Sequence, residues 1–456
     1  MNNKTIRIAS GQGFWGDLPV APVNQVKLGQ IDYLMMDYLA EVTMSIMQKQ
    51  KLRNPDFGYA RDFVGVIEQI LPEIAAGKVR VLSNGGGVNP QACKDAILRI
   101  ARDAGYTGLK VAVVDGDNIL PDLDRLISEG HELKNMETDA AVTEIKDKLL
   151  SANVYFGAEA MAEALDAGAH IVVTGRVTDT GLCLAPMVHE FGWRFDDADK
   201  MAAGTVAGHI LECGAQSSGG NFTDWQLVPD MENIGFPIVE ASADGSFVVT
   251  KHEKAGGLVS VATVKEQLLY EIGDPAEYIT PDCIADFTSI ELAQEGDNRV
   301  RVWGIKGKPK TPFYKVSASY LDGYKLTGTL VYAWPDALKK AVRAGEILKA
   351  RAENLGLQFD AFHAEYVGFN GCTEQPAGPD YDRDIPDEVQ LRVSLSGPSK
   401  ADLDRFGMEM APLILTGPSA VTGFAGGRPK AGEIVAYWPA LIRKDAVKPR
   451  MTIFST

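Results

Sequence analysis

Short apolar runs alternate with helical stretches through the first half of the chain. Five runs predict strands, at residues 5–10, 33–36, 79–83, 110–114 and 170–173. Apolar residues spaced three and four positions apart predict helices, at residues 62–76, 90–104 and 158–167. This alternation is typical of right-handed βαβ crossovers. We therefore predict an α/β fold with a doubly wound, mainly parallel sheet in the N-terminal half.

The pattern changes after about residue 235, where the apolar runs become shorter and alternate with polar residues. These runs predict antiparallel strands, at residues 247–251, 299–303, 315–319 and 389–395. A helical stretch at 335–354 interrupts them. A chain of 456 residues suits two domains, because single cores rarely grow past about 250–300 residues. We expect an α/β domain at 1–235 and an α+β domain at 236–456.

Polar residues and glycines follow each of the five predicted N-terminal strands. In a parallel sheet the carboxyl ends of the strands lie along one edge, so these residues should converge there. The functional site is therefore predicted at this edge. The candidates are Gly11, Gly13, Asp37, Asn84, Gly86, Asp115, Asp117, Arg176 and Asp179.

The spacing Gly11-x-Gly13-x-x-Gly16 matches a dinucleotide-binding fingerprint. Two prolines, Pro19 and Pro22, follow it where the fingerprint requires a helix, and no acidic residue lies at a convincing offset. Nicotinamide or flavin binding therefore loses support. A glycine-rich loop that admits a ligand to the strand ends is favoured.

Two pairs of carboxylates could serve a substrate or a divalent metal such as Mg²⁺. Asp37 and Glu41 would share one face if they lie on a helix, and Asp115 and Asp117 form the second pair. From the spacing alone, a solvated helix face is the favoured explanation for Asp37 and Glu41.

Arg176 and Asp179 follow a strand apolar enough to be central in the sheet. Arginine binds a carboxylate or phosphate through two parallel hydrogen bonds, which makes Arg176 a candidate for substrate binding. An Arg176–Asp179 ion pair that holds a loop is the alternative.

His209, Glu212 and Cys213 lie three and four positions apart, on one face of a predicted helical turn. An imidazole oriented by a carboxylate is suited to proton transfer near neutral pH. A structural histidine is the alternative, and Cys213 is either a nucleophile or a small buried hydrophobic residue. The glycine pairs Gly219-Gly220 and Gly256-Gly257 offer backbone N–H groups to a ligand or form turns.

Composition narrows the class of protein. A net charge of -16 argues against nucleic acid as a partner, because that binding needs clustered lysine and arginine. No apolar run approaches the roughly 20 residues that cross a bilayer, and the N-terminus lacks the pattern of a secretory signal. Five scattered cysteines, none spaced as CxxC, predict a reduced cytoplasmic protein without a disulfide framework or structural zinc.

Many of these segments together resemble the acyclic terpene utilisation (AtuA) family. The motifs that carry the resemblance are Gly11-x-Gly13 with Asp17, Ile31-Asp32-Tyr33 leading to Asp37-Tyr38-Leu39-Ala40-Glu41, Asn84 to Pro90, Tyr155-Phe156-Gly157, Thr174 to Asp179, Gly208-His209-x-x-Glu212-Cys213-Gly214, Ser218-Gly219-Gly220, Gly256-Gly257-Leu258-Val259, Glu266 to Glu271, Tyr278-x-Thr280-Pro281-Asp282 and Tyr437-Trp438-Pro439. They cover most of the chain in order.

The resemblance implies catabolism through acyl-CoA intermediates, so CoA is expected as part of the substrate rather than as a separate cofactor. Some members resemble a longer chain with a C-terminal ferredoxin-like domain. Because this chain ends at Thr456, soon after Tyr437-Trp438-Pro439, we expect a separate small subunit to supply that domain.

We predict an enzyme of carboxylic acid or acyl-CoA catabolism, a hydratase or dehydratase acting on a branched or hydroxylated acid or its CoA thioester, and expect it to be a homo-oligomer. The alternative is a ligand-binding or scaffold subunit that needs the small ferredoxin-like chain. An NAD-linked oxidoreductase is third. The expected catalytic residues are His209, Glu212, Asp179 and Asp37, and the expected substrate-binding residues are Gly11, Gly13, Asn84, Gly86, Arg176, Tyr155, Gly219, Gly220, Gly256 and Gly257.

Overall fold

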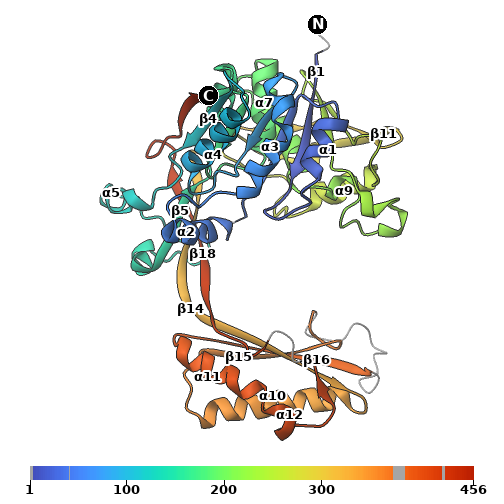
Figure 1. The fold of residues 1–456 in the computed structure, drawn as a ribbon. Coiled ribbons are helices and arrows are strands. Elements are labelled where there is room, and N and C mark those ends of the chain that lie inside the picture. The colour runs from blue at the N-terminus through green and yellow to red at the C-terminus, as the bar shows by residue number, and fades with distance from the viewer. Residues whose placement is uncertain (1–3, 41, 373–385, 424–426) are drawn as a thin grey trace. The chain divides into compact units, whose positions relative to one another are not determined.

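The computed structural model describes residues 4–40, 42–372, 386–423 and 427–456. The chain divides into two compact units (Figure 1). The first comprises Met1–Ser319 and Tyr437–Thr456, and the second comprises Tyr320–Ala436. No helix in the described ranges is both long and apolar enough to cross a membrane.

A ten-stranded mixed sheet forms the centre of the first unit. Five neighbouring strands are parallel, in the order β1 (Thr5–Gln12), β2 (Tyr33–Met36), β3 (Arg80–Ser83), β6 (Ile171–Thr174) and β4 (Lys110–Asp115). Antiparallel strands extend both edges, with β7 (Ile238–Ser242), β8 (Phe247–Thr250), β12 (Arg299–Trp303) and β11 (Glu291–Gly296) beyond β1, and β19 (Arg450–Ser455) beyond β4.

Helices bury both faces of this sheet (Figure 1). On one face a core cluster joins Ala9, Leu34 and Val81 to residues of three helices, α1 (Ala21–Leu28), α3 (Arg61–Ala75) and α4 (Pro90–Asp103). The alternate strand residues, such as Ile8 and Met35, point to the opposite face and are equally buried. Helices α7 (Gly181–Phe191) and α8 (Ala198–Glu212) contact β1 on the second face.

Shorter elements complete the first unit. They are α2 (Thr43–Arg53), α5 (Leu123–Ser128), β5 (Leu149–Val154), α6 (Glu159–Asp166), α9 (Val261–Leu269) and a small sheet of β13 (Lys306–Lys308), β10 (Ile284–Asp286) and β9 (Tyr278–Ile279).

The second unit is an α+β arrangement with its own core. Its strands lie in the order β15 (Ala361–Val367), β16 (Glu388–Gly397), β14 (Phe313–Ala333) and β17 (Val421–Thr422), and its main helices are α10 (Ala337–Asn354) and α11 (Lys400–Met410). Alternate residues of β16, such as Leu391 and Val393, pack with Leu348 of α10 and Phe406 of α11. The chain passes between the units within β14 and within β18 (Gly432–Arg443).

The mixed α/β class is confirmed, and the predicted strands at 247–251, 299–303 and 389–395 correspond to β8, β12 and β16. The expected boundary at residues 235/236 differs from the observed division. Strand β7 pairs with β1 just beyond that point, so the first sheet continues well past it. The last strand, β19, returns to pair with β4.

Candidate functional site

A cavity of about 490 Å³ lies beyond the carboxyl ends of β1, β2 and β6. Its lining combines loops that follow these strands with the end of α8 and the residues after α9. The lining residues are Gly13, Phe14, Asp17, Asp37, Leu39, Ala40, Arg176, Asp179, Glu212, Cys213, Ala215, Gln216, Tyr270 and Glu271. This is the edge at which the sequence predicts the site.

Asp37 lies in the loop directly after β2 and is only 5% exposed. Its Oδ1 accepts hydrogen bonds from Asn84 Nδ2 at 2.5 Å and from the backbone N–H of Leu39 at 3.0 Å. Asn84, which follows β3, is held in turn by the N–H of Tyr38 at 2.7 Å. Burial raises the pKa of Asp37 to about 6, against the lowering effects of Arg176 and Asn84. Asp37 is therefore a carboxyl group that titrates close to neutral pH.

Arg176 lies just after β6 and is 2% exposed. Its Nη2 forms an ion pair with Asp179 at 2.9 Å, and its Nη1 donates to the backbone carbonyl of Leu39. The guanidinium carbon lies 4.1 Å from the centre of the Tyr155 ring, which places Tyr155 against the arginine as a cation–π partner. The ion pair with Asp179, the alternative to substrate binding, is therefore present, and Arg176 also lines the cavity.

Asp117 holds the loop that carries Arg176. Its Oδ2 accepts from the backbone N–H of Arg176 at 2.9 Å and from Asn153 Nδ2 at 2.7 Å. Burial raises its pKa to about 6. A Cβ atom on Gly175 would lie 2.2 Å from Asp117 Oδ1, so a larger residue there would displace this carboxylate. Asp117 therefore positions Arg176.

Glu212 and His209 form a buried pair at the end of α8. His209 Nδ1 lies 2.7 Å from Glu212 Oε1, and Nε2 lies 2.8 Å from the carbonyl oxygen of Gln267. Burial lowers the pKa of His209, but the charge and hydrogen bond of Glu212 outweigh it, so the pKa is raised. Burial also raises the pKa of Glu212. Glu212 lines the cavity, and His209 lies behind it with both ring nitrogens engaged.

The backbone of the glycine-rich loop after β1 lies close to the backbone that follows α8. Gly13 donates its N–H to Asp17 Oδ2 at 2.9 Å, and Asp17 Oδ1 accepts from Leu18 at 2.7 Å. A Cβ atom on Gly13 would lie 2.5 Å from the backbone nitrogen of Gly214. Glycine is therefore required for this close approach at the cavity wall.

The other predicted glycines lie outside the described lining of this cavity. Gly11 packs against the side chains of β2, and a Cβ on Gly86 would lie 2.4 Å from a carbonyl of β6. The N–H groups of Gly219, Gly220, Gly256 and Gly257 donate within the protein, to the carbonyl oxygens of Gln216, Ala215, Asn233 and Pro229 respectively.

The sequence does not predict several of the lining residues as part of the site. Phe14, Gln216, Tyr270 and Glu271 reach the cavity from segments whose patterns show no catalytic spacing. Tyr270 and Glu271 follow α9, whose contact with α8 is a tertiary feature. The Glu266 to Glu271 segment of the family resemblance is the one signal that includes them.

The described residues contain no cluster of three or more His, Cys, Asp or Glu side chains placed to hold a metal ion. Asp115 pairs with Arg450 at 3.0 Å, and Glu41 lies outside the described residues. Asp37 lies in a loop, not in the helix that would have set it beside Glu41. All five cysteines are free, and burial raises the pKa of Cys213, which keeps its thiol protonated at neutral pH.

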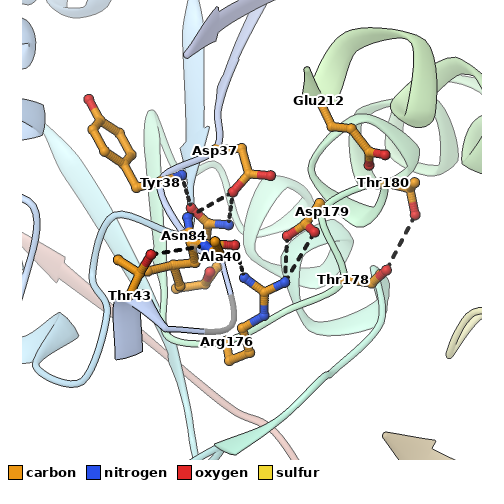
Figure 2. A network of polar contacts seen from close by, with 12 residues as sticks. Asp37, Tyr38, Ala40, Thr43, Asn84, Arg176, Thr178, Asp179, Thr180 and Glu212 are labelled. Carbon is orange, nitrogen blue, oxygen red and sulfur yellow. Dashed lines mark hydrogen bonds and ion pairs between the residues drawn. The ribbon is translucent and has the colours of Figure 1, made fainter. Parts of the chain in front are cut away.

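Figure 2 shows Asp37, Asp179 and Glu212, which come from three different elements, turned toward a shared space above Arg176. The lining carries one guanidinium and five carboxyl groups, and Asp37 and Glu212 have raised pKa values. A carboxyl group with a raised pKa keeps its proton at a higher pH than usual, which suits it to donate and accept protons.

These features define an α/β protein with an acid-rich cavity at the carboxyl edge of parallel strands. The model of the acyclic terpene utilisation family protein AtuA matches residues 6–453, and the chain belongs to this family. No curated protein and no solved structure matches the chain.

Proposed function

We propose that the protein is a hydro-lyase of carboxylic acid catabolism, which adds water to, or removes it from, a branched or hydroxylated acid or its CoA thioester. The observation that carries this proposal is the pair of carboxyl groups with raised pKa values, Asp37 and Glu212, lining one cavity. Dehydration needs one group to take a proton from carbon and another to protonate the departing hydroxyl. We take the sheet to be doubly wound, with ligands binding outside the strand ends.

In the proposed reaction, ionised Asp37 removes a proton from the carbon next to the carbonyl group. Protonated Glu212 donates to the hydroxyl, which leaves as water as the carbon–carbon double bond forms. The free Oδ2 side of Asp37 faces the cavity, since its described hydrogen bonds use Oδ1. Hydration is the reverse, with the same two proton positions.

Arg176 would bind the substrate carboxylate or a CoA phosphate. In the present structure the guanidinium group of Arg176 forms an ion pair with Asp179. The anionic group of the substrate would replace Asp179 as its partner. The released Asp179 carboxylate could then accept a hydrogen bond from the substrate hydroxyl. Tyr155, stacked on the guanidinium, would keep its plane in place during this exchange.

His209 is proposed as a positioning residue. It contacts Glu212 and the carbonyl of Gln267, so its effect on the reaction passes through the proton held by Glu212. A protonated His209 would favour ionised Glu212, and a neutral one would favour the protonated acid.

The test begins with thermal-shift measurements on branched acids, hydroxy acids and their CoA thioesters, followed by hydration assays on those that bind. Asp37→Asn and Glu212→Gln should each lower kcat by about 10²-fold or more. The matched controls are Asp103→Asn and Glu68→Gln, at exposed positions on α4 and α3. Turnover by Asp37→Asn at the wild-type rate would overturn the proposal.

A second candidate is a ligand-binding or scaffold subunit that acts with a small partner chain. It is favoured by apolar side chains exposed at the cavity rim: Phe14 is 57% exposed, Tyr270 39%, and the adjacent Leu269 71%. Under this alternative the purified chain alone binds ligand but shows no turnover. Full activity of the single purified species would rule it out.

A further inference from the structure

A second cavity, of about 690 Å³, lies near the amino end of β1. Its described lining shares no residue with the candidate site. Arg7 and Gly13 are six positions apart on and just beyond β1, which corresponds to about 20 Å along an extended strand. The lining residues are Arg7, Lys27, Leu28, Gly29, Gln30, Glu240, Thr250, Lys251, His252, Glu253, Lys254, Asp297, Asn298 and Arg299.

This cavity is cationic although the chain carries a net charge of -16. Its lining supplies five lysine and arginine side chains against three carboxylates. Leu28 is the single large apolar residue among those described in the lining, so the cavity is suited to a polar ligand. Its volume falls within the range of about 300–1,000 Å³ that small-molecule sites occupy.

One carboxylate is already neutralised by two guanidinium groups. Glu240 forms ion pairs with Arg7 and, at 2.6 Å, with Arg299. Its pKa is raised by burial, but hydrogen bonds and charge from the two arginines outweigh this, so the pKa is lowered. The Arg7–Glu240–Arg299 group therefore contributes net positive charge to the wall of the cavity.

Two exposed lysines in the lining of this cavity form no ion pair within the described residues. Lys27 lies in the last turn of α1, and Lys254 follows β8. Both are exposed, and neither forms an ion pair with any residue in the described ranges. Lys251, which is partly buried, donates to the carbonyl of Ala255 at 2.6 Å. Lys27 and Lys254 are thus free to meet an anion.

His252 adds a buried polar atom without a partner. It is 7% exposed, and its Nδ1 has no hydrogen-bond partner among the described residues. A buried polar nitrogen without a hydrogen bond is unfavourable, and a hydrogen bond from a ligand would offset this cost. This feature distinguishes the cavity from a hollow lined only by surface lysines.

We propose that this cavity binds a phosphorylated small molecule through its phosphate group, with Lys27 and Lys254 on the phosphate oxygens. A phosphate dianion needs two positive charges, whereas a single carboxylate needs one, and flexible lysines act as point charges for phosphate. The site is separate from the proposed acid–base cavity and does not depend on the function assigned there.

The test is isothermal titration of the intact protein with pyrophosphate and with glucose 6-phosphate, with citrate as a polycarboxylate of similar charge. Saturable binding of a phosphate compound, at least tenfold tighter than citrate, is expected. The double variant Lys27→Gln/Lys254→Gln should raise its Kd at least tenfold. Lys349→Gln, on the exposed side of α10, is the matched control and should bind as the wild type does.

Three results would overturn the proposal: no saturable binding of either phosphate compound, citrate binding as tight as phosphate, or an unchanged Kd in the double variant. Both lysines are exposed, so the fold should survive their replacement, and an unchanged melting temperature verifies this. Asp37→Asn should leave phosphate binding intact, which separates failure of this site from failure of the acid–base proposal.

Discussion

Burial determines the chemistry available to Asp37. Its raised pKa of about 6 places it between an ordinary aspartate and a histidine. If ionised Asp37 is the base, kcat/KM should fall about tenfold for each pH unit below 6, and it should fall again at higher pH as Glu212, the proposed acid, loses its proton. The measurement is the pH profile of kcat/KM for the hydration or dehydration assay.

Asn84 offers a way to test this assignment. Its Nδ2 hydrogen bond to Asp37 Oδ1 favours the ionised form and lowers the pKa. Asn84→Ala should therefore move the acid limb of the pH profile to higher pH. Asn354→Ala, at the exposed end of α10, is the control and should not move it. A limb that stays in place or moves to lower pH would assign the titration to another group.

A second buried carboxyl group affects stability rather than catalysis. Both oxygens of Asp282 lie 3.1 Å from the N–H of Ala158, and burial raises the pKa of Asp282 to about 6, above its unfolded value near 3.9. The stability associated with the protonated form is fully present below pH 3.9 and is lost as pH rises through 6. The loss at pH 7.5 is on the order of 2–3 kcal/mol.

Asp282→Asn should remove this pH dependence, because the amide is neutral and keeps one oxygen for Ala158. We expect a higher melting temperature than wild type at pH 7.5 and a similar one at pH 4. Thermal melts at both pH values provide the comparison, with the exposed Asp103→Asn as control. A lower melting temperature at pH 7.5 would show that attraction to Lys310 and Lys444 stabilises ionised Asp282 more than burial destabilises it.

The sequence identifies some site residues and not others, for a physical reason. Asp37, Arg176 and Asp179 follow buried strands, and strand ends must share one edge of a parallel sheet. Their convergence is therefore predictable. The direction that His209 faces is not predictable from the sequence, because it depends on the hydrogen bond between His209 Nε2 and the carbonyl oxygen of Gln267, which lies far along the chain. The position of Tyr270 at the cavity is not predictable either, because it depends on the packing of α9 against α8.

At the scale of single elements, the short parallel strands are predictable because they are apolar runs with clear ends. The predicted 79–83 and 170–173 lie within one residue of β3 and β6 at each end. Strand β14 is different: the sequence predicts only residues 315–319 of the 21 residues in Phe313–Ala333. Its middle, around the exposed Asp322 and the half-buried Gly323, contains no buried residue, so it lacks the alternation that marks a half-buried strand.

Two helical glycines give opposite predictions for the same substitution. A Cβ on Gly208, in α8, would lie 2.5 Å from the carbonyl oxygen and 2.6 Å from the Cα of Thr180, both backbone atoms that cannot move aside easily. A Cβ on Gly65, in α3, meets nothing within 4 Å. Gly208→Ala should destabilise the protein by about 1–3 kcal/mol, and Gly65→Ala should stabilise it by up to about 1 kcal/mol.

Urea denaturation of both variants checks this pair. Because the substitution and the secondary structure are the same, helix propensity favours alanine in both, and only the close packing of α8 against the start of α7 differs. Equal stabilisation by the two variants would mean that these helices are further apart than the structure has them.

At the scale of the whole molecule, the sequence indicates two domains but not where they divide. The change of pattern near residue 235 marks the point at which strands become antiparallel, yet β7 and β8 extend the sheet begun by β1. A change of strand direction within one sheet and a change of domain produce the same sequence pattern. The return of β19 to β4 is a pairing between distant segments, which periodicity does not encode.

Separate cores predict separate unfolding. The core around α3 and α4 in the first unit and the core around α10 and β16 in the second share no described residue. Scanning calorimetry should therefore resolve two transitions, since multidomain proteins depart from two-state behaviour.

Two substitutions assign each transition to its unit. Leu391→Ala, at a fully buried position of β16, should lower the melting temperature of one transition, and Ile97→Ala, equally buried in α4, should lower that of the other. Each substitution should cost about 2–5 kcal/mol in its own unit. A single transition that both variants lower alike would show that the strands β14 and β18 couple the units into one cooperative structure.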